Sequence, residues 1–163
     1  MRAPAEVRLE RLEKLIQRVT HESEQGCIII VEGNRDRESL RRLGIPGKIL
    51  CLQSSRKNPV GFVEEMDPDG KVIVLTDFDR EGVFLAKRLA RTLNYQKIHV
   101  NLVLWRELRG LTRSDIRSIE ELPKFHSRLR TEVFFGPQSA GREYESPYFV
   151  VRHKGRSKFL RKP

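Results

Sequence analysis

Short apolar runs alternate with amphipathic segments along much of this chain, and this alternation constrains the fold more than any other feature. Runs rich in β-branched and aliphatic residues occupy positions 27–31, 48–52, 72–76 and 99–104. Strands that alternate with helices usually pair in parallel, because each crossover helix returns the chain to the same end of the sheet. The pattern therefore predicts an α/β fold with a mostly parallel sheet of about four strands and helices on both faces.

The helices are predicted from apolar residues that recur at helical spacing. The first, over residues 5–25, is amphipathic and should pack one face on the domain. Further helices are expected over 34–43, 60–66 and 81–93, with shorter ones near 114–119 and 125–129 on either side of Pro123. Periodicity weakens beyond residue 130, apart from an apolar run at 148–151 where we expect a strand.

The length of the chain leaves room for one domain of ordinary size with terminal additions. We divide its 163 residues into an N-terminal helix (1–25), an α/β domain (26–130) and a basic C-terminal extension (131–163).

The charge of the chain indicates a polyanionic partner. Its 32 Lys and Arg residues exceed its 22 Asp and Glu residues, so the formal net charge is +10. Nucleic acid is the polyanion that this balance favours. The last twelve residues contain no acid, and we expect this tail to bind nucleic acid through Arg152, Lys154, Arg156, Lys158, Arg161 and Lys162.

The apolar runs are shorter than the roughly 18 residues that a membrane span requires, and the first residues lack the apolar stretch of a secretory signal. We therefore expect a cytoplasmic protein without a membrane partner. Cys27 and Cys51 lie in or beside predicted strands. We interpret them as small buried core residues, because two distant cysteines make neither a zinc motif nor a disulfide framework.

Acidic residues follow two of the predicted strands at the points where these strands end. Glu32 follows the run 27–31, and Asp77 and Asp79 follow the run 72–76. Because parallel strands end at one edge of a sheet, the three carboxylates can reach one crevice. Magnesium prefers oxygen ligands and is typically held by one or two carboxylates together with a substrate phosphate. We expect Asp77 and Asp79 to bind Mg2+, with Glu32 as a further ligand or as a general acid or base.

Simpler interpretations of these residues stay open. An Asp-x-Asp pair before a helix also serves as an N-cap in a solvated turn. Glu81 is either an additional metal ligand or a first-turn residue that complements the helix dipole. Trp105 either stacks on a base or closes the core, and we favour the core. Four basic residues near the predicted crevice would neutralise phosphates or simply form a solvated face: Arg35, Arg56, Lys57 and Arg80.

The two acidic segments resemble the motifs of the Toprim domain. The segments are Val31-Glu-Gly-Asn-Arg-Asp36 and Leu75-Thr-Asp-Phe-Asp-Arg-Glu-Gly82, and the likeness covers roughly residues 26–105. This Mg-binding module is shared by type IA and type II topoisomerases, bacterial-type primases, OLD-family nucleases and the ribonuclease that matures 5S ribosomal RNA. The chain is most similar to the small stand-alone archaeal Toprim proteins related to that ribonuclease.

The resemblance implies roles for individual residues. Glu32 matches the catalytic glutamate of the family, and Asp77 and Asp79 match its magnesium-binding aspartates. Glu81 would join the acidic set, as in type IA topoisomerases, but Val83 stands where those enzymes carry another glutamate. We do not expect autonomous topoisomerase activity, which needs a nucleophilic tyrosine on a further domain.

The function implied by the resemblance is a Mg-dependent action on nucleic acid. We expect cleavage of an RNA phosphodiester, of the kind that processes ribosomal RNA, and we favour RNA over DNA as the partner. A non-catalytic protein that binds RNA or the ribosome is the alternative. An accessory factor in DNA repair or topology is a further alternative.

Overall fold

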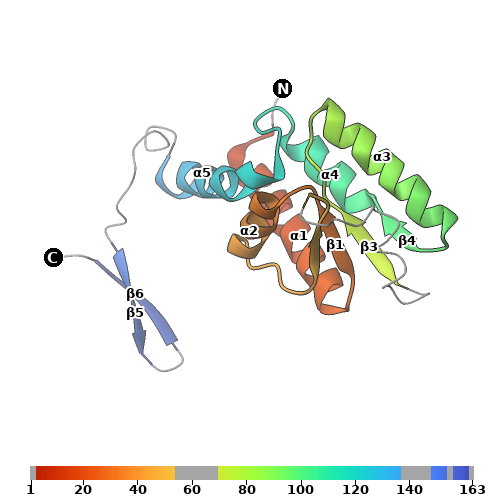
Figure 1. Cartoon of the computed structure of the whole chain (residues 1–163). Coiled ribbons are helices and arrows are strands. Elements are labelled where there is room, and N and C mark those ends of the chain that lie inside the picture. The colour runs from red at the N-terminus through yellow and green to blue at the C-terminus, as the bar shows by residue number, and fades with distance from the viewer. Residues whose placement is uncertain (1–2, 54–69, 137–147, 154–155, 162–163) are drawn as a thin grey trace.

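The structure is a computed structural model that describes residues 3–53, 70–136, 148–153 and 156–161, the last two ranges by their backbone alone (Figure 1). Four parallel strands form one sheet in the order β2-β1-β3-β4. These strands are β1 (Ile28–Val31), β2 (Ile49–Cys51), β3 (Lys71–Val74) and β4 (His99–Asn101). The helices are α1 (Ala5–Glu24), α2 (Asn34–Arg42), α3 (Arg80–Tyr95), α4 (Val103–Thr112) and α5 (Leu122–Phe135), with a 3-10 turn, η2, at Ile119–Glu121. The predicted parallel α/β fold is confirmed.

The sheet grows outward in two directions from its centre. From β1 the chain passes through α2 to β2 on one side, and from β3 it passes through α3 to β4 on the other. Because such crossovers are right-handed in about 98% of cases, two crossovers that run in opposite directions place α2 and α3 on opposite faces of the sheet. The carboxyl ends of β1 and β3 are consequently a topological switch point, where sheets of this kind bind ligands.

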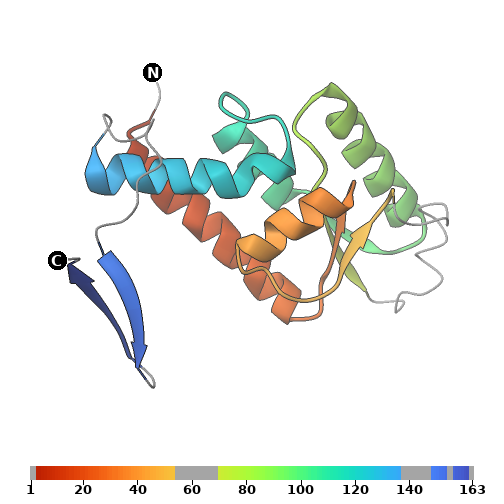
Figure 2. The same cartoon turned by 60° about the vertical axis from the view of Figure 1, so that its left-hand side comes forward.

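Helix α1 belongs to the same packed body as the sheet. Its buried face includes Leu12, Leu15 and Val19, and the helix contacts both α4 and α5. Figure 2 shows α5 lying across α1. Cys27 and Cys51 are both buried, as expected for core residues, and burial raises the pKa of the Cys27 thiol to about 11. No helix in the described ranges is long and apolar enough to cross a membrane.

The fourth strand is shorter than the sequence predicted, because a helix begins inside the same apolar run. The side-chain oxygen of Asn101 accepts a hydrogen bond from the Val103 backbone N–H at 2.9 Å, which starts α4 two residues after the strand ends. Trp105 therefore lies on a helix. Its indole N–H is buried and donates to the Thr76 carbonyl at 2.9 Å, so the interpretation of Trp105 as a core residue is correct.

Helix α5 is longer than predicted, because Pro123 does not break it. Pro123 is in the first turn of the helix, where the missing N–H has no intrahelical partner to lose. The capping interactions lie just upstream: the carboxylate of Glu121 accepts hydrogen bonds from the Ser118 backbone N–H and hydroxyl at 3.0 Å. This S-x-x-E pattern marks the start of the turn and the helix that follows.

Two antiparallel strands follow the α/β domain. They are β5 (Tyr148–His153) and β6 (Arg156–Arg161), paired from Tyr148–Arg161 to His153–Arg156. The strand predicted at 148–151 is confirmed, whereas β6 was not predicted in the basic tail. The side chains of Arg152, Arg156, Lys158 and Arg161 lie outside what the structure describes. So do the whole of Arg56, Lys57, the helix predicted over 60–66, Lys154 and Lys162.

Candidate metal and nucleic-acid site

The first acidic residue of the site, Glu32, links the ends of three strands. Directly after β1, its backbone carbonyl accepts the Gln53 N–H at 2.9 Å and so continues the pairing toward β2. Its side-chain Oε1 accepts the Asp77 N–H at 2.9 Å, just beyond the end of β3. Two residues earlier on each strand, the Leu75 N–H donates to the main-chain carbonyl of Ile30 at 2.8 Å. At the next position along the pair, the acceptor is the Glu32 side chain instead of a main-chain carbonyl. The carboxylate is thereby fixed at the switch point.

Asp77 is held by a segment that is remote in sequence. Its Oδ1 accepts the Ile119 N–H of η2 at 2.9 Å, and the neighbouring Phe78 N–H donates to the Arg117 carbonyl at 2.8 Å. Phe78 is buried, whereas Asp79 is exposed, so the two aspartates face the rim while the ring between them enters the core. Segment 117–119 therefore fixes the orientation of the Asp77 carboxylate.

Asp79 is the N-cap of α3. Its Oδ1 accepts the Gly82 N–H at 2.8 Å, which confirms the N-cap role. Metal binding by the same carboxylate stays a prediction. Thr76 donates its hydroxyl to the Gly82 carbonyl at 2.8 Å. A Cβ atom on Gly82 would collide with the Asp77 carbonyl, so only glycine permits the helix to begin this close to the strand end. Glu81, in the first turn of α3, is exposed.

The negative charges of the site's carboxylates raise one another's pKa. Burial raises the pKa of Asp77 to about 6, and the charges of Asp36, Glu32 and Asp79 add to the rise, although the Ile119 N–H opposes it. Burial likewise raises the pKa of Glu32, with added contributions from Asp36, Asp79 and Glu81. A cation placed between such groups would relieve this repulsion and favour their ionised forms.

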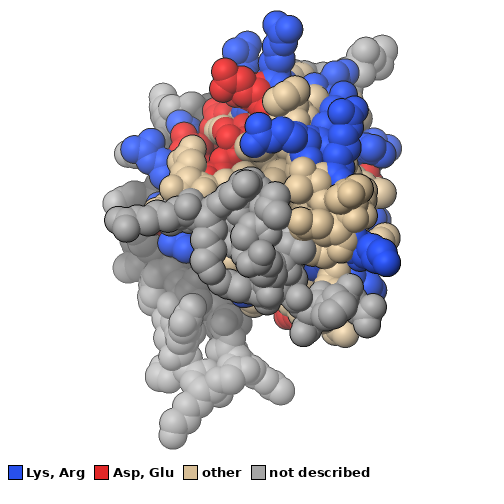
Figure 3. All heavy atoms as spheres, turned by 45° about the vertical axis from the view of Figure 1, so that its right-hand side comes forward, with Lys and Arg blue, Asp and Glu red and all other residues tan. Residues whose placement is uncertain are grey.

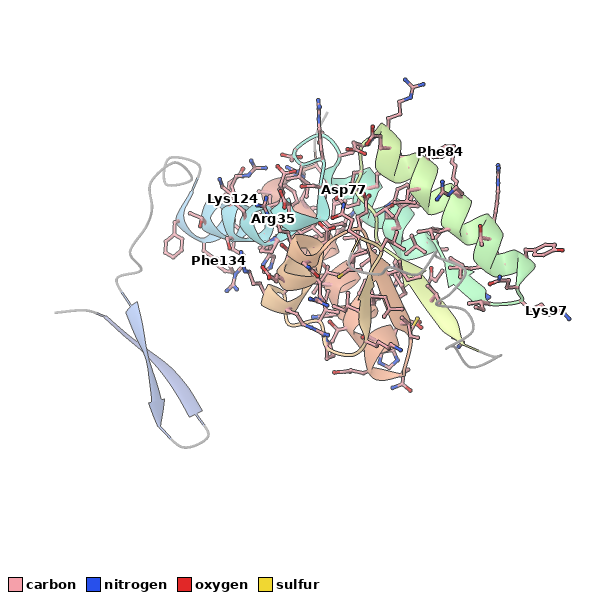
Figure 4. The ribbon with its side chains drawn as sticks, viewed as in Figure 1. Arg35, Asp77, Phe84, Lys97, Lys124 and Phe134 are labelled. Carbon is pink, nitrogen blue, oxygen red and sulfur yellow. The ribbon has the colours of Figure 1, made fainter. Side chains whose placement is uncertain are left out.

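A pocket of about 360 Å³ opens beside these acids. Its lining includes Glu32, Asp77, Asp36 and Arg35, with Ser118 and Glu120 from the segment around η2. The buried carboxylate of Asp36 accepts the Gly33 N–H at 2.9 Å and so stabilises the start of α2. The Arg35 side chain is 86% exposed and 4.0 Å from Glu120. Figure 4 shows both Arg35 and Asp77 on this side of the molecule.

The donor set suits a hydrated hard cation better than a closed metal cage. No three His, Cys, Asp or Glu side chains in the described ranges lie close enough together to form a ready-made metal cluster. The hydrogen bonds that Glu32, Asp77 and Asp79 accept from described residues each use one carboxylate oxygen, so the second oxygen of each group can face a ligand. Oxygen donors of this number fit Mg2+, which keeps several of its waters. Direct coordination by all three carboxylates stays a prediction.

The structure brings into the site several groups that we did not predict. The main-chain N–H of Ile119 and the side chains of Ser118 and Glu120 come from around η2. Arg109 of α4 donates to the Phe78 carbonyl at 3.3 Å and lies over the Trp105 ring. The Ser118–Glu121 capping pattern was the available sequence signal, because it predicts a helix start at that point.

The fold and the ordered pair of acidic motifs define a class of protein. Residues 26–103 match the model of the Toprim domain. The resemblance to the Toprim domain is thereby confirmed. This chain contains a Toprim domain, which associates it with nucleic acid and with a divalent metal.

Its relatives identify the family more narrowly. The chain is 37% identical to a UPF0292 protein of Methanosarcina acetivorans over 127 residues, which are 77% of this chain and 87% of that protein. It is also 37% identical to a UPF0292 protein of Pyrococcus furiosus, covering 79% of this chain and 93% of the relative. The chain belongs to the UPF0292 family, whose name states no activity.

A solved structure shares the fold. It is described as a putative protein from Aquifex aeolicus and superposes with a TM-score of 0.55 at 26% sequence identity. The match covers 66% of this chain and 94% of the other, so the similarity extends over nearly the whole of the smaller protein.

Proposed function

We propose that this protein is a Mg-dependent nuclease that cleaves a phosphodiester of RNA, with precursor ribosomal RNA as the first substrate class to test and the cytoplasm as its location. The observation that carries the proposal is the position of the Glu32 carboxylate, which accepts the Asp77 N–H at the switch point of a Toprim sheet. Burial, chiefly, raises the pKa of this carboxylate. A raised pKa makes a carboxylate a better general base and keeps its protonated form available as a general acid to a higher pH.

Each residue has a separate task in this proposal. Asp77 and Asp79 hold Mg2+, with Glu81 as an additional ligand, and the bound ion would offset the charge that develops on a phosphoryl group. Water attacks the phosphorus and the bond to the departing oxygen breaks; Glu32 accepts the proton of the attacking water or donates one to the departing oxygen. Arg35 and Arg80, both exposed beside the acids, bind the flanking phosphates and position the strand.

The test separates proton transfer from binding. Glu32→Gln retains an oxygen for the Asp77 N–H but cannot act as an acid or base, so we expect at least about a hundredfold loss of cleavage with binding within about twofold. The assay is Mg-dependent cleavage of the RNA that co-purifies with the protein, identified first by sequencing. Glu24→Gln, an exposed change at the end of α1, is the matched control. Cleavage by Glu32→Gln at the wild-type rate would refute the proposal.

A non-catalytic RNA- or ribosome-binding protein is the second candidate. Two observations favour it: the net charge of +10 and the lack of a ready-made metal cluster within the described ranges. Such a protein would bind RNA equally well after Glu32→Gln or chelation of metal, and would lose affinity when residues 152–163 are removed. An accessory role in DNA repair or topology would instead require tighter binding to DNA than to RNA.

A further inference from the structure

Two aromatic side chains project from α3 into solvent. Phe84 is 67% exposed and Tyr95 is 90% exposed, which makes them the most exposed large hydrophobic side chains in the part of the chain that the structure describes. Figure 4 shows Phe84 on the outer side of α3, away from the sheet. Aromatic rings this exposed contribute little to the fold and are accessible to a binding partner.

The aromatics alternate with cations along one face of the helix. Positions 80, 84, 87, 91 and 95 follow one another at intervals of three or four residues, which is the spacing that lines residues up on a helix surface. Position 88 joins them, because it lies four residues after 84 and three before 91. All six side chains are exposed. We call this face the α3 strip: Arg80, Phe84, Lys87, Arg88, Arg91 and Tyr95.

Apart from Glu81 in its first turn, helix α3 carries positive charge with no acid to balance it. From Gly82 to His99 the chain contains no Asp or Glu. Lys87, Arg88 and Arg91 make no ion pair with any described residue, and Lys97 extends the same charge beyond the end of α3. A soluble helix whose cations were only solvating would commonly alternate them with acids at i and i+4. The strip is therefore suited to an anionic partner.

The strip begins at the acidic site. Arg80 follows Asp79, the N-cap of α3, and Tyr95 lies fifteen residues further, which is about 22 Å along a helix. Figure 3 shows Lys and Arg side chains gathered beside the patch of acidic side chains on this face of the molecule. A nucleic-acid strand bound at the acidic site would have about 22 Å of basic and aromatic surface beside it. This length is enough for about six stacked nucleotides at ~3.4 Å each.

The combination of cations and aromatic rings selects unpaired nucleotides. Cations attract any nucleic-acid backbone, but rings stack only on bases whose faces are accessible. In a duplex those faces are covered by neighbouring base pairs, so exposed aromatics add nothing to its binding. A protein partner fits less well, because charged residues are depleted in the centre of protein interfaces, and the strip has four cations for two rings.

We propose that the α3 strip binds a single-stranded RNA segment adjoining the phosphodiester at the acidic site, with Phe84 and Tyr95 stacking on its bases. This inference rests on the proposed function for the nature of the polymer and adds that the substrate is unpaired next to the site. The enzyme would then act at loops, ends or junctions and would leave continuous duplexes uncut.

The test compares aromatic variants on paired and unpaired RNA. Fluorescence anisotropy would measure binding of a short unstructured RNA oligonucleotide, the same sequence as a duplex, and the same sequence as single-stranded DNA. The double variant Phe84→Ala with Tyr95→Ala should weaken single-stranded RNA binding at least about tenfold, because two stacking platforms are lost, and should change duplex binding less than about twofold. Phe134→Ala, which removes a ring 65% exposed at the end of α5, is the matched control and should change neither.

Several results would overturn this inference. They are an equal loss on paired and unpaired RNA, no loss on either, tighter binding to single-stranded DNA than to RNA, or a wild-type dimer in sedimentation that the double variant dissociates. Measuring binding in the Glu32→Gln background separates this test from that of the nuclease. If the α3 strip does not bind RNA while Glu32 remains essential for cleavage, only this inference is refuted. If Glu32→Gln cleaves normally, only the role of Glu32 in the proposed mechanism is refuted.

Discussion

Replacing Asp77 with Asn should stabilise the protein in the absence of metal. The change removes one negative charge from the acidic site but keeps an oxygen that can accept the Ile119 N–H. The pKa of Asp77 is raised from 3.8 to about 6, chiefly by burial and then by Asp36, Glu32 and Asp79. At neutral pH the folded protein therefore carries an aspartate whose ionised form is less stable than it is in the unfolded chain.

The size of the effect follows from the rise in pKa. At about 1.4 kcal/mol per unit the rise of about two units corresponds to roughly 3 kcal/mol, which solvent screening of this half-buried group reduces to about 1–2 kcal/mol. Because the folded pKa is the higher one, the wild type loses this stability as the pH rises from about 4 to above 6. The Asn variant lacks the titrating group, so its advantage should be full at pH 8 and absent below pH 4.

Magnesium should reverse the order of stability. A ligand that binds only the folded state stabilises it by about 2.7 kcal/mol at a concentration of 100 times its dissociation constant. We expect the wild type to gain this stability and the Asn variant to gain much less, because its site has lost a ligand charge.

Urea unfolding at pH 8, in EDTA and in Mg2+, measures both effects, with Glu24→Gln as the control that changes neither. An Asn variant no more stable than the wild type in EDTA, with an undiminished response to Mg2+, would refute this account of Asp77.

Three further predictions concern neighbouring residues. Gly82→Ala should lower the free energy of unfolding by about 2–4 kcal/mol, because the new Cβ would collide with the Asp77 carbonyl. Gly110→Ala in α4 is the control: its Cβ would meet no atom, so the free energy of unfolding should stay the same or rise by up to about 1 kcal/mol. Urea unfolding would measure both variants. Asp79→Ala should cost about 1 kcal/mol through loss of the α3 cap, and Asp79→Asn should restore the cap without restoring Mg2+ binding, which calorimetry would detect. Trp105→Phe should cost about 1–3 kcal/mol by leaving the buried Thr76 carbonyl unpaired, and an unchanged unfolding midpoint would contradict the role assigned to the indole.

Local patterns were sufficient to predict most of the elements of this fold. Alternating apolar runs and helical spacing gave the four parallel strands, α1 and α3, because periodicity reflects which face of each element is buried. The same reasoning placed Glu32, Asp77 and Asp79 after strands that end at one edge of the sheet. It missed α4, whose start depends on one hydrogen bond from the Asn101 side chain within a run that otherwise looks like a strand.

The sequence by itself determined the α/β class and the acidic residues, since these depend on residue types and spacing along the chain. Only the tertiary structure decided which carboxylate meets which group. The pairing of β1 with β3 rather than with β2 alone brings Glu32 onto the Asp77 N–H across 45 residues, and segment 117–119 closes on Asp77 from 42 residues away. Local periodicity cannot specify such neighbours, because strand order and loop docking follow from burying the whole core at once.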